Sequence, residues 1–149
     1  MRRRNVCTTI AAVTLMAIDY GGKRIGVALS DSGVLATPHS VVRNEGDVVE
    51  TLARLAQELG AETIVVGIPR RAHAGAGERT YRELAEGLRQ RTRKEVVLWD
   101  EALTTAEAAE NLRVSGVSRR DAQREIDMHA AAVILQSYLD AGARSGRTS

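Results

Sequence analysis

Three acidic residues follow apolar runs that are typical of buried strands. Asp19 comes after VTLMAI and before two glycines, and Asp100 and Glu101 come directly after VVLW. The carboxyl ends of strands in an open α/β sheet meet at one edge, where sites form. Carboxylates there, with no neighbouring Cys or His pair, suit Mg²⁺ or Mn²⁺ and not zinc. Two such ions can activate water and stabilise the leaving oxygen in phosphodiester cleavage.

A fourth acidic residue, Asp127, lies on the apolar stripe of the predicted last helix. Residues at helical spacing from it complete the stripe: Ala130, Ala131, Ile134, Leu135 and Tyr138. A carboxylate on such a face is costly unless it is paired or binds a metal. We therefore expect Asp19, Asp100, Glu101 and Asp127 to form a catalytic cluster.

Each acidic residue also has a purely structural interpretation. Asp19 could simply belong to a glycine turn, and one of Asp100 and Glu101 could cap the turn that follows. Asp127 could form an ion pair with Arg24 or Arg124. Only the conjunction of the acidic residues favours the metal site over these alternatives.

The hydrophobic pattern changes its period along the chain. Three strands over 13–19, 23–30 and 34–43 are separated by glycine turns, which predicts an antiparallel meander. Helices and strands then alternate: 48–59, 63–68, 78–92, 95–100, a helix over 106–113, and a last helix from Ser118 to about Leu139. This order predicts an α/β fold with one mixed five-stranded sheet and helices on both faces.

Length and composition set the broad class of protein. The 149 residues are 44% hydrophobic and 27% charged, typical of one soluble globular domain. We expect that domain over residues 13–140, between a disordered basic tail at 1–12 and a disordered tail at 141–149. Cys7 is the only cysteine and no apolar run is long enough to span a membrane, so a cytoplasmic protein without membrane contact is expected.

Arginine dominates the basic residues. Residues 70–94 contain eight basic and three acidic side chains, and Arg70 and Arg71 open a glycine-rich loop at the expected edge of the acids. Arginine favours bidentate contact with phosphate. Aromatic residues make up only 3% of the chain, which argues against reading single-stranded bases by stacking. Solvated helix faces are the alternative interpretation.

Four motifs in order give the chain a resemblance to the YqgF/RuvX family of the ribonuclease H-like superfamily. They are DYGGKRIGVALSD, IVVGIP followed by GAG, WDEALTT, and IDMHAAAVILQSYLD, and together they span roughly residues 14–140. The resemblance implies a ribonuclease H-like sheet and a nuclease that matures the 5′ end of pre-16S ribosomal RNA, with some members linked to junction DNA.

The motifs also imply roles for individual residues. The metal ligands would be Asp19, Glu101 and Asp127, with Mg²⁺ or Mn²⁺ as cofactor. Gly67, near the end of its strand, has no side chain, so the acid that accompanies Asp19 must come from the next strand. Substrate contacts are expected from Lys23, Arg24, Arg70, Arg71, Gly75, Thr104 and Thr105.

Several functions stay open at this stage. The partner is expected to be structured nucleic acid, either pre-rRNA or junction DNA, bound by a monomer or a homodimer. A catalytically weak RNA-binding factor that kept the fold is an alternative, and its best support is Ala102, which replaces an arginine of the family motif. The D-x-G turn at Asp19 is also similar to the phosphate loop of actin-like and sugar kinases, but the chain has neither the length nor the repeat for their second lobe.

Overall fold

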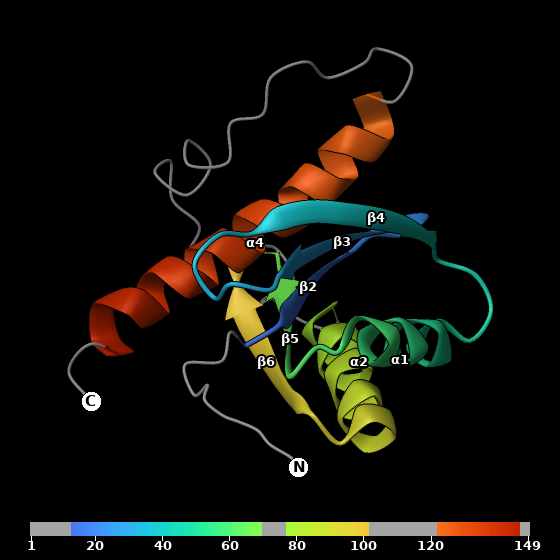
Figure 1. Ribbon diagram of the computed structural model, residues 1–149. Coiled ribbons are helices and arrows are strands. Elements are labelled where there is room, and N and C mark those ends of the chain that lie inside the picture. The colour runs from blue at the N-terminus through green and yellow to red at the C-terminus, as the bar shows by residue number, and fades with distance from the viewer. Residues whose placement is uncertain (1–12, 70–76, 102–121, 147–149) are drawn as a thin grey trace.

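The computed structural model describes residues 13–69, 77–101 and 122–146. Five strands form one sheet in the order β4-β3-β2-β5-β6 (Figure 1). Their bounds are β2 Leu15–Tyr20, β3 Arg24–Ser30, β4 Thr37–Arg43, β5 Thr63–Ile68 and β6 Glu95–Asp100. The first three strands pair antiparallel, whereas β5 and β6 extend the sheet in parallel from β2. The predicted mixed sheet is therefore confirmed.

Helices cover both faces of the sheet. α1 (Val48–Leu59) and α2 (Gly77–Thr92) lie on one face, and the long α4 (Ala122–Gly146) crosses the other (Figure 1). α1 begins where the Asp47 carboxylate accepts a hydrogen bond from the Glu50 N–H, and it ends at Gly60 in the left-handed conformation. Both are standard helix boundaries, an N-cap and a glycine C-cap.

Alternating side chains of the sheet divide the core into two layers. On β2, Met16 and Ile18 pack beneath α1 and α2, whereas Leu15 and Ala17 pack against α4. All four are at most 6% exposed, as expected for a central strand covered on both faces. The same alternation decides on which face of the sheet each further side chain of a strand lies.

Two glycines let α4 lie unusually close to the sheet. A Cβ atom at Gly26 of β3 would overlap the backbone carbonyl oxygen of Asp127. At Gly67 of β5 it would lie 2.5 Å from Ile134 Cδ1. The sheet therefore supplies the small residues at this contact, in addition to the alanines of the helix.

The structure corrects two predicted boundaries. α4 continues to Gly146, beyond the expected end near Leu139, so residues 141–146 are helical and not part of a disordered tail. Alanine and arginine favour helix, and no proline stops it. β4 begins at Thr37 and not at residue 34. The backbone before it pairs with the Gln136 side chain instead of a strand: Gln136 Oε1 accepts from the Ala36 N–H at 2.9 Å, and Gln136 Nε2 donates to the Val34 carbonyl at 3.0 Å.

Some predicted segments lie outside the described residues: the two tails as far as 1–12 and 147–149, the loop at 70–76, and the helix over 106–113. No helix in the described ranges combines the length and the apolar character needed to cross a membrane.

The Gly26 contact gives a first testable prediction. Gly26→Ala should lower the free energy of unfolding by about 1–3 kcal/mol, because the added methyl group must displace α4. Gly22→Ala is the matched control, since a Cβ there meets no atom within 4 Å. Urea denaturation measures both variants, and equal stability of the two would contradict the close contact.

Candidate functional site

Asp19 lies near the end of β2 on the face that α4 covers. It is paired in register with Gly26 on β3, directly beneath the backbone of Asp127. Burial, followed by the negative charges of Glu101 and Asp127, raises the pKa of the Asp19 carboxyl to about 6. Three carboxylates from three separate elements therefore interact electrostatically at this edge of the sheet.

Asp127 is held from two sides. Its backbone carbonyl lies over Gly26, and its Oδ2 accepts a hydrogen bond from Arg24 Nε at 2.8 Å. The side chain of Asp127 is 20% exposed and that of Arg24 is 41% exposed. The ion pair with Arg24, one of the structural interpretations of Asp127, is thus present, and it fixes α4 to the start of β3.

The structure separates Asp100 from Glu101. Asp100 is in register with Ile68 and continues the side of β6 on which Val96 and Leu98 pack beneath α1 and α2. Glu101 follows one residue later and is half-buried, and its charge raises the pKa of Asp19. The alternation of the strand thus favours Glu101 over Asp100 as the neighbour of Asp19.

Trp99 anchors this end of β6 to α4. Its indole Nε1–H donates to Ser137 Oγ at 3.1 Å, and its ring meets that of Tyr138 edge-on with centroids 5.2 Å apart. Because Trp99 points to the α4 face, these contacts hold the end of β6, two residues before Glu101, against α4.

The donor chemistry of the three acids fits a hard divalent cation. Asp19, Glu101 and Asp127 offer only carboxylate oxygens, which Mg²⁺ and Mn²⁺ prefer. Yet within residues 13–69, 77–101 and 122–146, no three His, Cys, Asp or Glu side chains are grouped so as to hold a metal ion. In this arrangement the positive charge beside Asp127 is supplied by Arg24.

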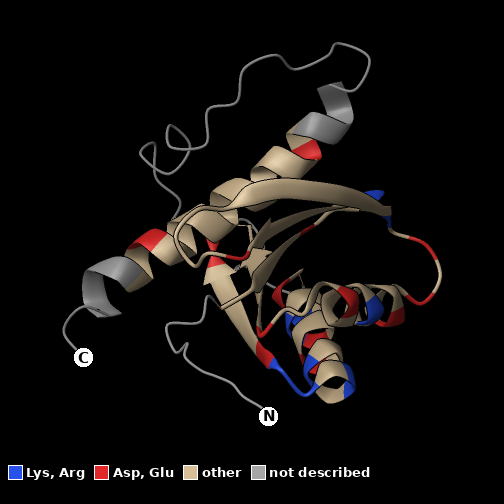
Figure 2. Cartoon of the chain, in the orientation of Figure 1, with Lys and Arg blue, Asp and Glu red and all other residues tan. Residues whose placement is uncertain are grey.

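Of the predicted substrate contacts, the structure describes Lys23 and Arg24, at the β2–β3 turn and the start of β3. The remaining ones, Arg70, Arg71, Gly75, Thr104 and Thr105, lie outside the described residues. Arg24 faces Arg43 across the β3–β4 pair. Figure 2 shows basic residues at this turn and at the neighbouring end of β4.

A hollow of about 450 Å³, here called the hairpin hollow, opens beside this turn. Its lining residues are Gly22, Lys23, Arg24, Val41, Arg43, Asn44 and Glu45. Sequence reasoning missed the contribution of β4. The meander was the available signal, because it places the start of the second strand opposite the end of the third.

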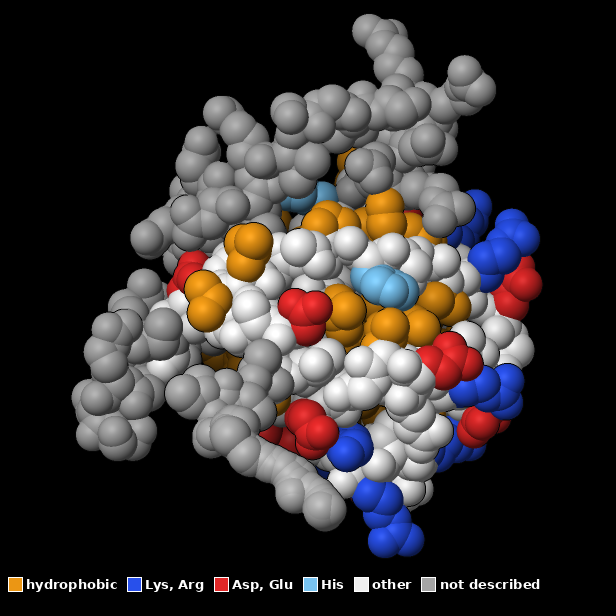
Figure 3. Space-filling view, viewed as in Figure 1, with side chains coloured by type: hydrophobic (Ala, Val, Ile, Leu, Met, Phe, Trp, Pro, Cys, Tyr) orange, Lys and Arg blue, Asp and Glu red, His pale blue; other side chains and the backbone are white. Residues whose placement is uncertain are grey.

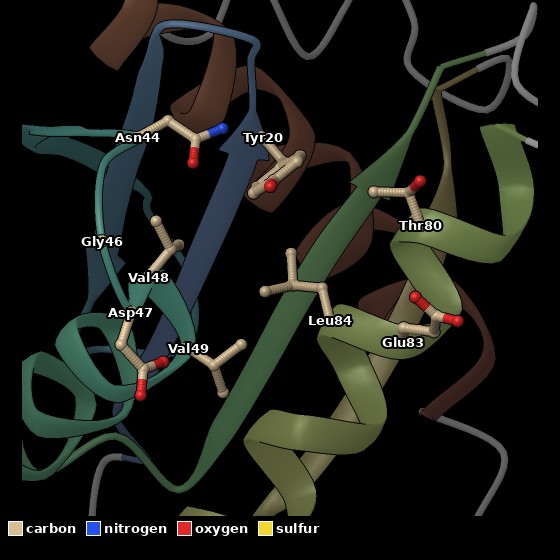
Figure 4. A pocket seen from close by; sticks show the side chains of 9 residues that line it. All are labelled: Tyr20, Asn44, Gly46, Asp47, Val48, Val49, Thr80, Glu83 and Leu84. Atoms are coloured by element: carbon tan, nitrogen blue, oxygen red, sulfur yellow. The ribbon is translucent and has the colours of Figure 1, made fainter.

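A second hollow, of about 310 Å³, lies between the end of β2 and the starts of α1 and α2 (Figure 4). Asp47 and Glu83 line it, and no lysine or arginine is among the described residues of its lining. Asp47 also caps α1 and lies 3.5 Å from Arg91 Nη1. This charge pattern does not suit a phosphate group, so the hairpin hollow is the better candidate for nucleic acid.

Named relatives are similar in sequence to this chain over most of its length. A relative from Mycobacterium tuberculosis that carries the name "Putative pre-16S rRNA nuclease" is 44% identical over 131 residues, covering 84% of this chain and 77% of the relative. Another from Desulforamulus reducens is 39% identical over 137 residues, covering 87% and 98% respectively.

Solved structures show the same fold at low identity. RuvC from Thermus thermophilus in complex with a Holliday junction matches with a TM-score of 0.61 at 12% identity, covering 90% of this chain and 96% of that one. The yeast mitochondrial Holliday junction resolvase Ydc2 matches with a TM-score of 0.54 at 12% identity, covering 92% and 82%. The ribonuclease H-like α/β fold expected from the sequence is therefore confirmed.

The family described as "RuvX: Holliday junction resolvase" matches residues 13–141. That range includes every strand of the sheet and the acids at its edge, in agreement with the resemblance drawn from the four motifs. This chain belongs to the RuvX family.

Proposed function

We propose that this protein is a metal-dependent nuclease that hydrolyses phosphodiester bonds, with the 5′ end of pre-16S rRNA as its substrate. The observation that carries the proposal is the half-buried Asp19 carboxyl, whose pKa is raised by burial and by two further carboxylates, Glu101 directly after β6 and Asp127 on α4. Like charges gathered in a poorly solvated place cost folding free energy, and a role in binding a cation explains why they are there. Relatives named as pre-16S rRNA nucleases support the choice of substrate.

Cleavage of junction DNA is the second candidate. The description of the matched family as a Holliday junction resolvase favours it. RNA and DNA present the same scissile group, so the carboxylates do not discriminate between them. The two substrates must be separated by experiment.

The ligands of the proposed metal are Asp19, Glu101 and Asp127. When bound, Mg²⁺ or Mn²⁺ supplies an activated water and stabilises the leaving oxygen. Asp19 loses its proton near pH 6, so it is ionised at pH 7 and able to act as a ligand. Arg24 orients Asp127 through the Nε–Oδ2 hydrogen bond, and Trp99 holds the end of β6 against α4.

A cleavage assay with four variants tests this assignment. Structured pre-rRNA and a four-way DNA junction are incubated with Mn²⁺ or Mg²⁺, and the products are resolved on gels. Loss of a residue that only supports a metal ligand lowers activity roughly 10–100-fold. Because Asp19, Asp127 and Glu101 are assigned as ligands themselves, Asp19→Asn, Asp127→Asn and Glu101→Gln should each lower the cleavage rate by more than this.

Asp100→Asn is the matched control, because Asp100 continues the other face of β6. It should retain most of the activity. If Asp100→Asn abolishes cleavage and Glu101→Gln does not, the assignment from strand alternation is wrong. If the wild type cleaves neither substrate with either metal, the nuclease proposal fails.

Stability against pH tests the cost of the carboxylate cluster independently of activity. The pKa of Asp19 in the folded state, about 6, exceeds the ordinary aspartate pKa of 3.8, so the folded state binds this proton more tightly than the unfolded state. The wild type should therefore lose stability as the pH rises from about 4 to about 6. Above pH 6 in EDTA, Asp19→Asn should be more stable than the wild type by up to about 3 kcal/mol.

Chemical denaturation at pH 4.5, 6 and 7.5 provides the measurement. The difference between Asp19→Asn and the wild type should shrink towards zero at the acidic end, where Asp19 is already neutral. A variant less stable than the wild type at pH 7.5 would show that Asp19 serves the fold as a charged partner.

A further inference from the structure

We infer that the hairpin hollow is a phosphate subsite that binds the nucleic-acid backbone next to the cleaved bond. The inference rests on the proposed nuclease function and adds a second contact on the strand. It assigns to Arg43 and Glu45 of the β4 end a part in substrate binding that the sequence motifs do not include.

The two walls of the hollow are held in place by hydrogen bonds. The Asn44 N–H donates to the Lys23 carbonyl at 3.0 Å, and Asn44 Nδ2 donates to the Gly21 carbonyl at 2.7 Å. The turn itself is closed by the Gly21 N–H, which donates to the Arg24 carbonyl at 3.1 Å. Asn44 thus fastens the end of β4 to the β2–β3 turn, so the hollow is formed before any ligand binds.

The charge of the hollow is positive. Among the described residues that line it, Lys23, Arg24 and Arg43 are basic and Glu45 alone is acidic. The Arg43–Glu45 pair is long, 3.7 Å, and its side chains are 80% and 70% exposed, so water competes strongly with it. Basic and acidic side chains gather at the molecular edge beside the end of β4 in the space-filling view (Figure 3).

Arginines on the helices have a different environment. Arg54, Arg82 and Arg89 each pair with a glutamate three or four residues away on the same helix. Lys23, by contrast, forms no ion pair with any residue in the described ranges. The hairpin hollow therefore offers positive charge that the fold itself uses little.

The position of the hollow connects it to the acids. Arg24 lines it and also bonds Asp127, and that bond uses one of the five N–H donors of the guanidinium. The carboxylates repel the phosphates of a nucleic-acid strand that binds next to them. The basic residues of the hollow, Arg24 among them, attract those phosphates. Within the described part of the chain no aromatic side chain lines the hollow, so the ligand is the backbone phosphate and not a base.

The size of the hollow agrees with this ligand. About 450 Å³ falls within the range of small-molecule sites, about 300–1,000 Å³. It therefore admits a phosphodiester together with part of its neighbouring sugars. Contacts of this kind do not depend on sequence, so they suit either RNA or DNA.

Binding without catalysis tests the subsite. Fluorescence anisotropy is measured in EDTA over a salt series, with a labelled four-way DNA junction and a labelled RNA stem-loop as probes. Arg43→Gln should weaken binding to both probes by up to about eightfold at 0.1 M salt and lower the salt slope by about 0.7–0.9, the effect of one lost phosphate contact. Glu45→Gln should tighten binding about two- to fivefold, because it removes the one negative charge among the described residues that line the hollow.

Matched variants on α1 serve as controls. Arg54→Gln and Glu58→Gln change the same charges on exposed residues of that helix, and both should leave affinity and slope close to the wild type. The subsite is overturned if Arg43→Gln behaves like Arg54→Gln, if Glu45→Gln binds no more tightly than Glu58→Gln, or if the wild type binds neither probe. A cleavage assay on the same probes with Mn²⁺ separates the two proposals: binding that responds as expected without cleavage leaves the subsite standing and rejects the nuclease.

Discussion

The arrangement of this protein depends on how closely α4 lies against the sheet at Gly26. There the backbone carbonyl oxygen of Asp127 occupies the space that a Cβ atom at position 26 of β3 would need. Because Gly26 is in register with Asp19, the same contact brings the helix over the carboxylate of the central strand. Gly67 repeats the principle on β5, where Ile134 fills the space of the missing side chain. Interiors pack too densely for such a contact to tolerate an extra methyl group without movement.

The close approach concentrates negative charge where little water reaches it. Asp19 bears the free-energy cost of this charge, since burial together with the charges of Glu101 and Asp127 raises its pKa to about 6. Arg24 offsets the charge of Asp127 alone, through a hydrogen bond of 2.8 Å. Positive charge continues from Arg24 along the turn into the hairpin hollow. Attraction for a polyanion and repulsion among carboxylates thus lie side by side, an arrangement suited to holding a phosphodiester beside a cation.

Much of this could be predicted from the chain. The change from period two to helical period predicted the meander and the alternating elements, and the structure confirms the five-stranded mixed sheet. Apolar runs ending in Asp19 and Asp100 placed the acids at strand ends, because strand hydrophobicity is local information. The end of α4 was predicted too early, since the tail lacks an apolar stripe although its alanines and arginine still favour helix.

The residue types and the order of the elements were thus determined by the sequence, together with the resemblance carried by four motifs. Only the tertiary structure decided which face each acid presents: Asp100 continues the face under α1 and α2, and the charge of Glu101 acts on Asp19. It also decided that Arg24 pairs with Asp127 across 103 positions of the chain, and that Arg43 faces Arg24. These relations depend on strand register and helix packing, which bring distant residues together and leave no mark in local spacing.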